Sequence, residues 1–204
     1  MACLSIEKLT YHHGIEVNLT IDGPECACIS GPSGSGKALL LRAIADLDPH
    51  DGRVTLDGLD RADIDAPTWR RRVGLLPAHS AWWGTTVGEH FLAGPPNNLE
   101  VLGFDDDVLG WEIRRLSTGE RQRLAIFRLL ANEPEAILLD EPTANLDPAN
   151  LERVEGFIRD YQLRTQAPAL WVTHDQAQVA RLQARFYQID GTRVIEQPGG
   201  ARVP

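Results

Sequence analysis

A glycine-rich loop that ends in a lysine constrains the fold of this chain more than any other segment. Its residues are Gly31, Pro32, Ser33, Gly34, Ser35, Gly36 and Lys37. The apolar run at 27–29 before it is typical of a strand covered on both faces, and residues 37–45 after it have helical apolar spacing. Such a loop presents backbone N–H groups and a positive helix end to phosphate groups. The alternative is a glycine-rich turn without a ligand, which the lysine and the flanking elements disfavour.

The residue after the lysine departs from the usual pattern of a phosphate loop. A Ser or Thr hydroxyl normally stands there and binds Mg²⁺. Ala38 has a methyl group, which cannot coordinate a hard cation. We therefore expect a nucleotide site with one magnesium ligand missing.

Strand and helix patterns alternate along the chain, with turn residues at 57–58 and around Pro67. Apolar and polar residues alternate over 17–21, which is typical of an antiparallel strand with one solvated face. Buried strands are expected at 136–139 and 169–172, and helices at 118–131, 148–164 and 176–182. This pattern predicts an α/β fold similar to that of P-loop NTPases: a mainly parallel sheet with helices on both faces and an N-terminal antiparallel β-subdomain.

The segment from about 87 to 132 reads as a small inserted helical subdomain. A Gly-Pro-Pro-Asn-Asn stretch at 94–98 interrupts any long helix there, so only short amphipathic pieces are expected on either side. The length of 204 residues and an ordinary composition favour one domain, 1–204, that carries this insertion.

Composition excludes several classes of protein. The 20 Lys and Arg against 29 Asp and Glu give a net charge of −9, which argues against a nucleic acid as the main partner. No apolar run is long enough to span a bilayer, and the N-terminus does not resemble a signal peptide, so a cytoplasmic location is expected. Cys26 and Cys28 are interpreted as small core residues.

Two acidic residues follow the apolar run at 136–139. Ligands bind at the carboxyl ends of strands in open α/β sheets, which is where Asp140 and Glu141 are expected to lie. Asp140 is placed to hold Mg²⁺ or its waters, and Glu141 is the candidate for polarising an attacking water. The alternative is a pair of acids that only end a strand.

A helix start precedes this strand by about twenty residues. In Leu116-Ser117-Thr118-Gly119-Glu120, the serine and the glutamate satisfy a capping box. Together with the phosphate loop and the acidic strand end, this order of motifs resembles the ATP-binding cassette (ABC) ATPases over nearly the whole chain. Leu116-Glu120 then resembles the family's signature motif, with Thr118 where glycine is usual.

The resemblance implies a head-to-tail dimer of two cassettes with ATP in the interface. Ser117 and the N–H of Gly119 would face the γ-phosphate of the partner's ATP, beside Thr118 and Glu120. Asp147, in Ala-Asn-Leu-Asp at 144–147, resembles the D-loop that crosses the interface; it could also cap a helix, and both can hold together. His174 resembles the switch histidine that contacts the γ-phosphate.

Two further positions carry weaker resemblances. Tyr11 resembles the aromatic residue that stacks on adenine, although packing is the alternative, and His12 with His13 is read as a solvated turn. Ala78 stands where the family has the glutamine of its Gln loop, a second magnesium ligand; His79 or Ser80 could replace it.

Trp82 and Trp83 follow the Gln loop, in the region where the family's ATPase subunits receive a segment of the membrane permease. Two adjacent indoles cannot easily both face inward, so at least one is expected to form an exposed docking surface.

The function expected from this resemblance is that of a transporter's ATPase subunit, which uses ATP and Mg²⁺ to drive a separate permease at the inner face of the cell membrane. A homodimer and a heterodimer with another cassette both remain open, and the missing ligands predict slow hydrolysis. The alternative is a degenerate cassette that binds nucleotide in a regulatory or structural role. A DNA-maintenance ATPase would need a long coiled-coil insertion, which the sequence between the loop and the signature lacks.

Overall fold

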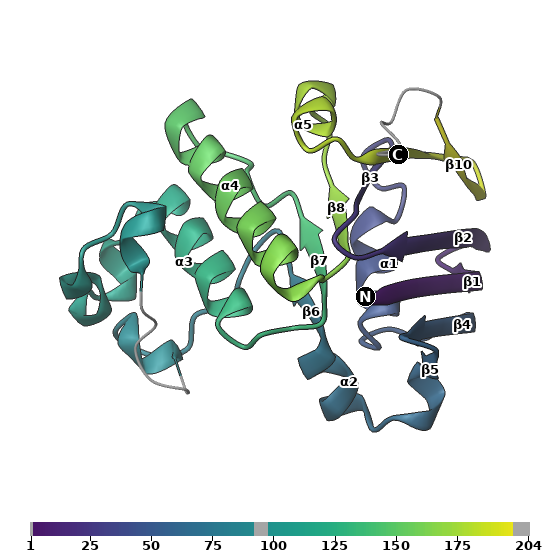
Figure 1. Ribbon diagram of the computed structural model, residues 1–204, viewed down its shortest axis with the longest axis horizontal. Helices are drawn as coiled ribbons and strands as arrows, with labels where there is room; N and C mark the ends of the chain where they lie inside the picture. The colour runs from purple at the N-terminus through teal and green to yellow at the C-terminus, as the bar shows by residue number, and fades with distance from the viewer. Residues whose placement is uncertain (1, 92–97, 198–204) are drawn as a thin grey trace.

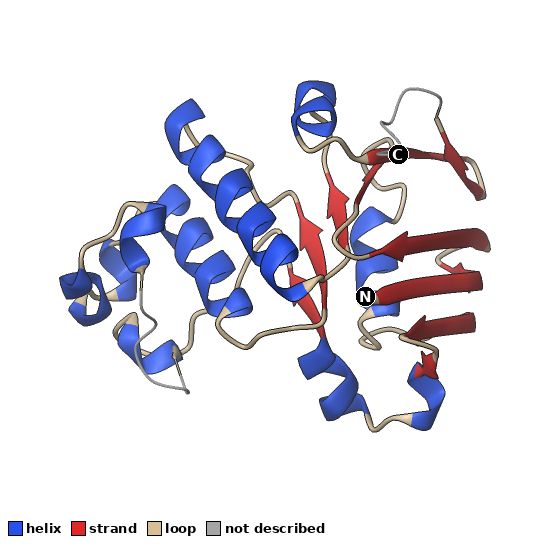
Figure 2. Ribbon diagram, viewed as in Figure 1, coloured by secondary structure: helices blue, strands red, loops and turns tan. Residues whose placement is uncertain are grey.

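One sheet runs through the protein and joins an antiparallel half to a parallel half (Figure 1, Figure 2). The computed structural model describes residues 2–91 and 98–197. Within them the strand order is β5-β4-β1-β2-β10-β9-β3-β8-β7-β6. The strands are β1 Cys3–Tyr11, β2 Ile15–Asp22, β3 Cys26–Ser30, β4 Asp51–Leu56, β5 Leu59–Asp60, β6 Val73–Leu76, β7 Ala136–Asp140, β8 Ala169–Val172, β9 Arg185–Asp190 and β10 Arg193–Glu196.

The antiparallel half contains the N-terminal strands. β1 pairs with β2 on one side and β4 on the other, and β2 alternates strictly between buried and exposed residues. The buried side chains of this half pack against helix α1 (Lys37–Ile44), which lies behind the sheet in Figure 1. The predicted N-terminal antiparallel subdomain with one solvated face is therefore confirmed.

The parallel half separates two hydrophobic cores. β9, β3, β8, β7 and β6 pair in parallel, and the side chains of β7 point to alternate faces. Leu138 joins the core beneath α1, whereas Ile137 and Leu139 join the core formed with α3 (Thr118–Leu130) and α4 (Pro148–Thr165). The predicted mainly parallel sheet with helices on both faces is confirmed, as is the expected closing hairpin, β9 with β10.

The turn expected around Pro67 is wrong, because that residue begins helix α2 (Ala66–Arg72). Asp65 accepts a hydrogen bond from the N–H of Thr68 at 3.0 Å and caps the helix, and proline is favourable in a first helical turn. Trp69 is fully buried, and its indole N–H donates to the carbonyl of Ile44 at 2.9 Å. The tertiary contact with α1 thus stabilises a helix too short to be recognised from periodicity.

The insertion between β6 and β7 lies at the far end of the molecule from the antiparallel strands (Figure 1). Short 3-10 helices at Gly88–His90, Leu99–Leu102, Asp106–Gly110 and Ile113–Arg115 precede α3. The bridge between Thr86 and Glu112 closes the base of this segment. The expected interruption at 94–98 lies mostly outside the described residues.

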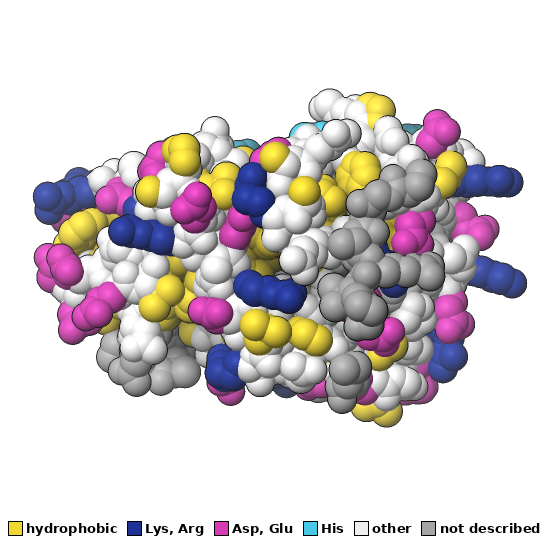
Figure 3. All heavy atoms as spheres, turned by 45° about the horizontal axis from the view of Figure 1, so that its top comes forward, with side chains coloured by type: hydrophobic (Ala, Val, Ile, Leu, Met, Phe, Trp, Pro, Cys, Tyr) yellow, Lys and Arg dark blue, Asp and Glu magenta, His cyan; other side chains and the backbone are white. Residues whose placement is uncertain are grey.

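The remaining expectations concern the core and the surface. Cys26 and Cys28 are buried, as expected for small core residues. In the part of the chain that the structure describes, no helix is long and apolar enough to cross a membrane. Acidic and basic side chains are interspersed over the described residues of the face in Figure 3.

Candidate functional site

The glycine-rich loop connects β3 to α1, and its terminal lysine folds back onto the loop. Gly34 and Gly36 adopt left-handed φ angles of 78° and 85°, and Gly36 is the N-cap of α1. Lys37 is 8% exposed, and its Nζ donates to the carbonyls of Gly31 at 2.8 Å and Pro32 at 2.9 Å. Burial lowers the pKa of this ammonium group, although nearby carboxylates oppose the shift. The loop therefore surrounds the ammonium group of Lys37, which lies near the carboxylates of Asp140 and Glu141.

Gly36 is also in close contact with the turn after β1. A Cβ atom there would lie 2.8 Å from Cδ2 of His12, and this ring tilts against His13 with 4.2 Å between centroids. His13 is exposed and His12 half-buried, so the expected solvated turn is found. His12 therefore lies beside the loop, with His13 packed against it.

Tyr11, the residue expected to stack on adenine, is placed in the core instead. It is 5% exposed and packs with the buried residues under α1, and burial raises the pKa of its phenol above the usual range. A ring covered in this way has no free face for a base. In this structure Tyr11 therefore packs in the core, and the rings of Tyr11 and His12 both lie close to Gly36 of the loop.

The two acids stand where β7 ends. Asp140 is half-buried and accepts a hydrogen bond from the backbone N–H of Ala78; burial, and then Glu141, raise its pKa. Lys37 and His79 act in the opposite direction on this pKa. The Gln-loop segment and the phosphate loop therefore both approach the carboxylate of Asp140.

Glu141 meets His174, which follows β8. Nε2 of His174 lies 3.2 Å from Oε1 of Glu141, and the side chains are 52% and 39% exposed. The N–H of Glu141 donates to the carbonyl of Val172, and Glu141 has a φ of 48°, which turns the chain sharply after β7. The structure brings together the two residues expected to be catalytic, on one accessible edge of the sheet.

The signature segment begins α3 through the expected capping box. The N–H of Glu120 donates to Oγ of Ser117 at 3.2 Å, and Oε2 of Glu120 accepts from the N–H of Ser117 at 2.8 Å. These bonds lower the pKa of Glu120. Ser117 and Thr118 are exposed, so the positive end of α3 faces outward.

The D-loop segment lies directly against this helix start. A Cβ atom at Gly119 would be 3.3 Å from a methyl group of Leu146. Asp147 caps α4 by accepting from the N–H of Asn150 at 3.0 Å, as one of the two interpretations expected. Arg123 of α3 donates to Oδ1 of Asn150 at 2.6 Å and holds the two helix starts together.

The two residues that could replace the missing glutamine lie in different surroundings. His79 is exposed and close enough to Asp140 to influence its pKa. Ser80 has a buried Oγ and lines a cavity together with Trp83 and Arg128. Trp83 is 68% exposed, so the expected exposed indole is found.

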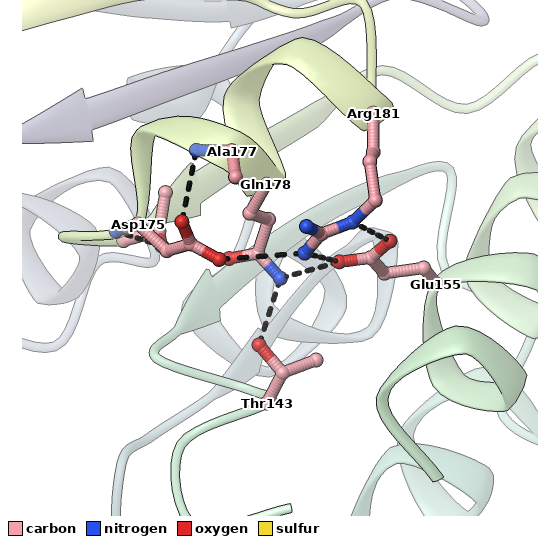
Figure 4. Close-up of polar contacts among 7 residues, drawn as sticks. Thr143, Glu155, Asp175, Ala177, Gln178 and Arg181 are labelled. Atoms are coloured by element: carbon pink, nitrogen blue, oxygen red, sulfur yellow. Dashed lines mark hydrogen bonds and ion pairs between the residues drawn. The ribbon is translucent and has the colours of Figure 1, made fainter. Parts of the chain in front are cut away.

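Sequence reasoning missed a polar network behind the site (Figure 4). Nε2 of Gln178, on α5 (Gln176–Arg181), donates to Oγ1 of Thr143 and to Oε1 of Glu155, both at 2.8 Å. Arg181 donates to both oxygens of Glu155 at 2.9 and 3.0 Å. The sequence did contain an indication of this network. Glu155 lies next to Val154 on the buried side of α4, and a buried carboxylate needs a hydrogen-bond partner.

Comparisons with known proteins agree with this geometry. The model of the ABC transporter family matches residues 15–144. The STAR1 protein of rice is 36% identical over 82% of this chain and 52% of its own length. The lipoprotein-releasing system ATP-binding protein LolD of Anaeromyxobacter dehalogenans is 35% identical over 91% of this chain and 85% of its own length.

A solved structure, a post-hydrolysis dimer of the ATP-binding cassette MJ0796 bound to ADP and Pi, superposes with a TM-score of 0.79 and 28% identity. It covers 97% of this chain and 98% of that one. The chain spans about half the length of the rice protein.

The phosphate loop between β3 and α1, with acids at the end of β7 on the other side of β8 in the same parallel sheet, defines a P-loop NTPase. The outward-facing signature segment and the comparisons specify it further: the chain belongs to the ABC transporter family, as an ATP-binding cassette.

Proposed function

We propose that this chain binds and hydrolyses ATP between two cassettes and so drives transport through a separate membrane permease. The observation that carries the proposal is the contact between Glu141 and His174 at 3.2 Å, beside the loop of Lys37. A carboxylate and an imidazole at the mouth of a phosphate site are suited to water activation. We propose that 1–204 act as one cassette, with about 87–132 as its shortened helical subdomain.

The nucleotide would lie on the loop at 31–37. Its phosphates would receive the backbone N–H groups of the loop and the N-terminal dipole of α1. Lys37 would exchange its bonds to the carbonyls of Gly31 and Pro32 for bonds to the outer phosphates. Its low exposure fits this role, since a buried cation gains from an anionic ligand.

Magnesium fits the residues present, with few ligands from the protein. Over the described ranges 2–91 and 98–197, no three His, Cys, Asp or Glu residues form a metal cluster. Asp140 would hold the ion or its waters, and Ala38 offers no hydroxyl. When bound, Mg²⁺ neutralises charge on the phosphate groups during transfer.

Glu141 would polarise the attacking water, and His174 would orient Glu141 and face the γ-phosphate. Nε2 of His174 lies 3.2 Å from Oε1 of Glu141, close enough for the imidazole to orient the carboxylate. The outward-facing Ser117, the N–H of Gly119 and Asp147 would complete the site of a second cassette, homologous or identical. The chain would reach the inner face of the membrane only through its permease.

Glu141→Gln tests the catalytic assignment. We expect ATP-dependent phosphate release to fall by about 100-fold or more, because general-base catalysis is lost. Binding of ATP should persist, and size-exclusion chromatography with ATP should show a trapped dimer. Glu152→Gln, an exposed change on α4, is the matched control and should behave as wild type.

A wild type that binds ATP but releases no phosphate at any Mg²⁺ concentration would instead assign the chain to the alternative, a degenerate cassette with a regulatory role. Equal rates of wild type and Glu141→Gln, both well above background, would contradict the role of Glu141.

A further inference from the structure

The loops that carry Glu141 and His174 leave neighbouring strands of the parallel sheet. Asp140 of β7 is in register with Val172 of β8, so both loops start at the same edge. The contact between the two side chains, at 3.2 Å, joins groups that are 39% and 52% exposed. An exposed pair of this kind contributes little to holding two loops in place. The alignment of the proposed catalytic residues therefore needs support from other contacts.

A buried glutamine on α5 joins the same two loops. Gln178 is 2% exposed and lies in the first turn of α5, four residues after His174. Its Nε2 donates to Oγ1 of Thr143 at 2.8 Å, and Thr143 stands two residues after Glu141 (Figure 4). Burial shields this hydrogen bond from competition by water. It is therefore better suited than the exposed contact to fix the separation of the loops.

Glu155 of α4 sets the orientation of the Gln178 amide. Its carboxylate accepts from two nitrogens of Arg181 at 2.9 and 3.0 Å, and from Nε2 of Gln178 at 2.8 Å. An amide oxygen turned toward this carboxylate would be repelled, so the amide nitrogen must face it. The two hydrogens of that nitrogen are then used by Glu155 and Thr143. The charge of Glu155 thus fixes the direction of the bond to Thr143.

Both ends of this bond belong to tight turns. Thr143 lies inside the turn at 141–144, which a backbone hydrogen bond of 3.1 Å closes. The turn around His174 is closed by the N–H of Asp175, which donates to Oγ1 of Thr173 at 3.1 Å. A shift of either turn would therefore displace the carboxylate or the imidazole at the site.

We propose that Gln178 and Thr143 are positioning residues, which hold Glu141 at the distance from His174 that water activation requires. They act on the reaction through the two loops and not by contact with ATP. This inference rests on the proposed function, because it concerns the geometry of the proposed catalytic pair. A displacement of about 1 Å can lower the rate of a catalysed step strongly. Loss of the bond should therefore slow hydrolysis and leave ATP binding intact.

The test compares steady-state ATP hydrolysis and ATP binding of variants of this chain. Thr143→Val keeps the shape of the side chain and removes the hydroxyl, so kcat should fall about tenfold or more, whereas the KM and Kd for ATP should change less than about twofold. Thr143→Ser keeps the hydroxyl and should retain most of the wild-type kcat. Gln178→Met should slow hydrolysis in the same way. The double variant Thr143→Val with Gln178→Met should be no slower than Gln178→Met alone, because both changes remove the same bond.

Gln162→Met is the matched control for the loss of a buried amide. Gln162 is also 2% exposed, and its Nε2 donates to the backbone carbonyls of Pro24, Glu25 and Ala167 at 3.2, 3.1 and 3.3 Å. Its replacement should lower the thermal stability, as Gln178→Met does. It should leave kcat unchanged at a temperature where both variants are folded.

Three results would overturn the inference alone, when Glu141→Gln strongly reduces hydrolysis in the same assay. They are a Thr143→Val chain with the wild-type kcat, an equal loss of kcat in Thr143→Ser, and a loss of kcat that Gln162→Met reproduces. A Glu141→Gln chain that hydrolyses ATP as fast as wild type would instead refute the proposed catalytic pair, and this inference with it.

Discussion

At the level of single residues, two alanines occupy the positions where we expected side-chain ligands of Mg²⁺. Ala38 follows the phosphate-loop lysine, and Ala78 approaches Asp140 with its backbone N–H and not with a side-chain ligand. We expect Ala38→Ser to raise turnover and to tighten Mg²⁺ binding, because the hydroxyl adds a hard-cation ligand at an unchanged helix start. Ala78→Gln should add to the effect. Titration of Mg²⁺ in steady-state ATPase assays measures both.

The competing possibility is a site rebuilt around His79, which lies near Asp140. In that case the wild-type rate is already fast and neither substitution changes it, and His79→Ala lowers Mg²⁺ affinity instead. Ala62→Ser, in the short helix at Arg61–Asp63, is a neutral control for an added hydroxyl.

At the scale of elements, the start of α3 serves stability and function together. Ser117→Ala removes the cap and should cost about 1 kcal/mol in the free energy of unfolding. It should also reduce ATP-driven dimerisation, since the hydroxyl is proposed to face the partner's nucleotide. Asp65→Ala is the matched control, because Asp65 caps α2 in the same way, on an element outside the proposed site. Denaturant unfolding and sizing with ATP separate the two roles.

If both substitutions lower the free energy of unfolding equally and neither changes dimerisation, Ser117 acts only as a helix cap. The pH dependence differs between these variants. Because hydrogen bonds from Ser117 lower the pKa of Glu120, they contribute stability above the ordinary pKa of glutamate that is lost as pH falls through the lowered value. Ser117→Ala should reduce this acid-side loss, because the hydroxyl is removed and only the backbone N–H at 117 still donates to Glu120, whereas Asp65→Ala should leave it unchanged.

At the scale of the whole molecule, the network in Figure 4 ties elements that are distant in sequence. Glu155 of α4 accepts from Gln178 and Arg181 of α5, and α5 directly follows the loop of His174. Glu155→Ala removes one of the two acceptors of the buried Gln178 amide and leaves Arg181 with only the longer contact to Asp175, so it should cost about 1–3 kcal/mol of stability. Glu152→Ala on the same helix should change stability by less than about 0.5 kcal/mol. Thermal and urea unfolding measure the difference.

Hydrogen exchange of Glu155→Ala should show the loss of amide protection first in α5 and in the loop of His174, because these segments have few other contacts with α4. Equal unfolding free energies of Glu155→Ala and Glu152→Ala would mean that the network is not a structural tie.

The class of fold and the local elements with a strong residue pattern were predictable from the amino-acid sequence alone. The strand, glycine loop and helix around Lys37 were predictable, because steric and hydrogen-bonding requirements act there over a few neighbouring residues. The cap at Ser117 and the acids at the end of β7 were predictable for the same reason. Family resemblance then placed Asp147 and His174 in order along the chain.

Which residues contact one another and which are buried depends on how the elements pack. Whether Tyr11 faces a ligand or the core depends on the packing of β1 under α1, which alternation along one strand cannot show. The contact of Glu141 with His174 and the bonds of Gln178 join strands or helices far apart in the sequence. From the sequence, Arg128 is an ordinary basic residue of a helix, and only the folded structure places its guanidinium against the indoles of Trp82 and Trp83. Burial and pairing are properties of the assembled cores, so no local pattern contains them.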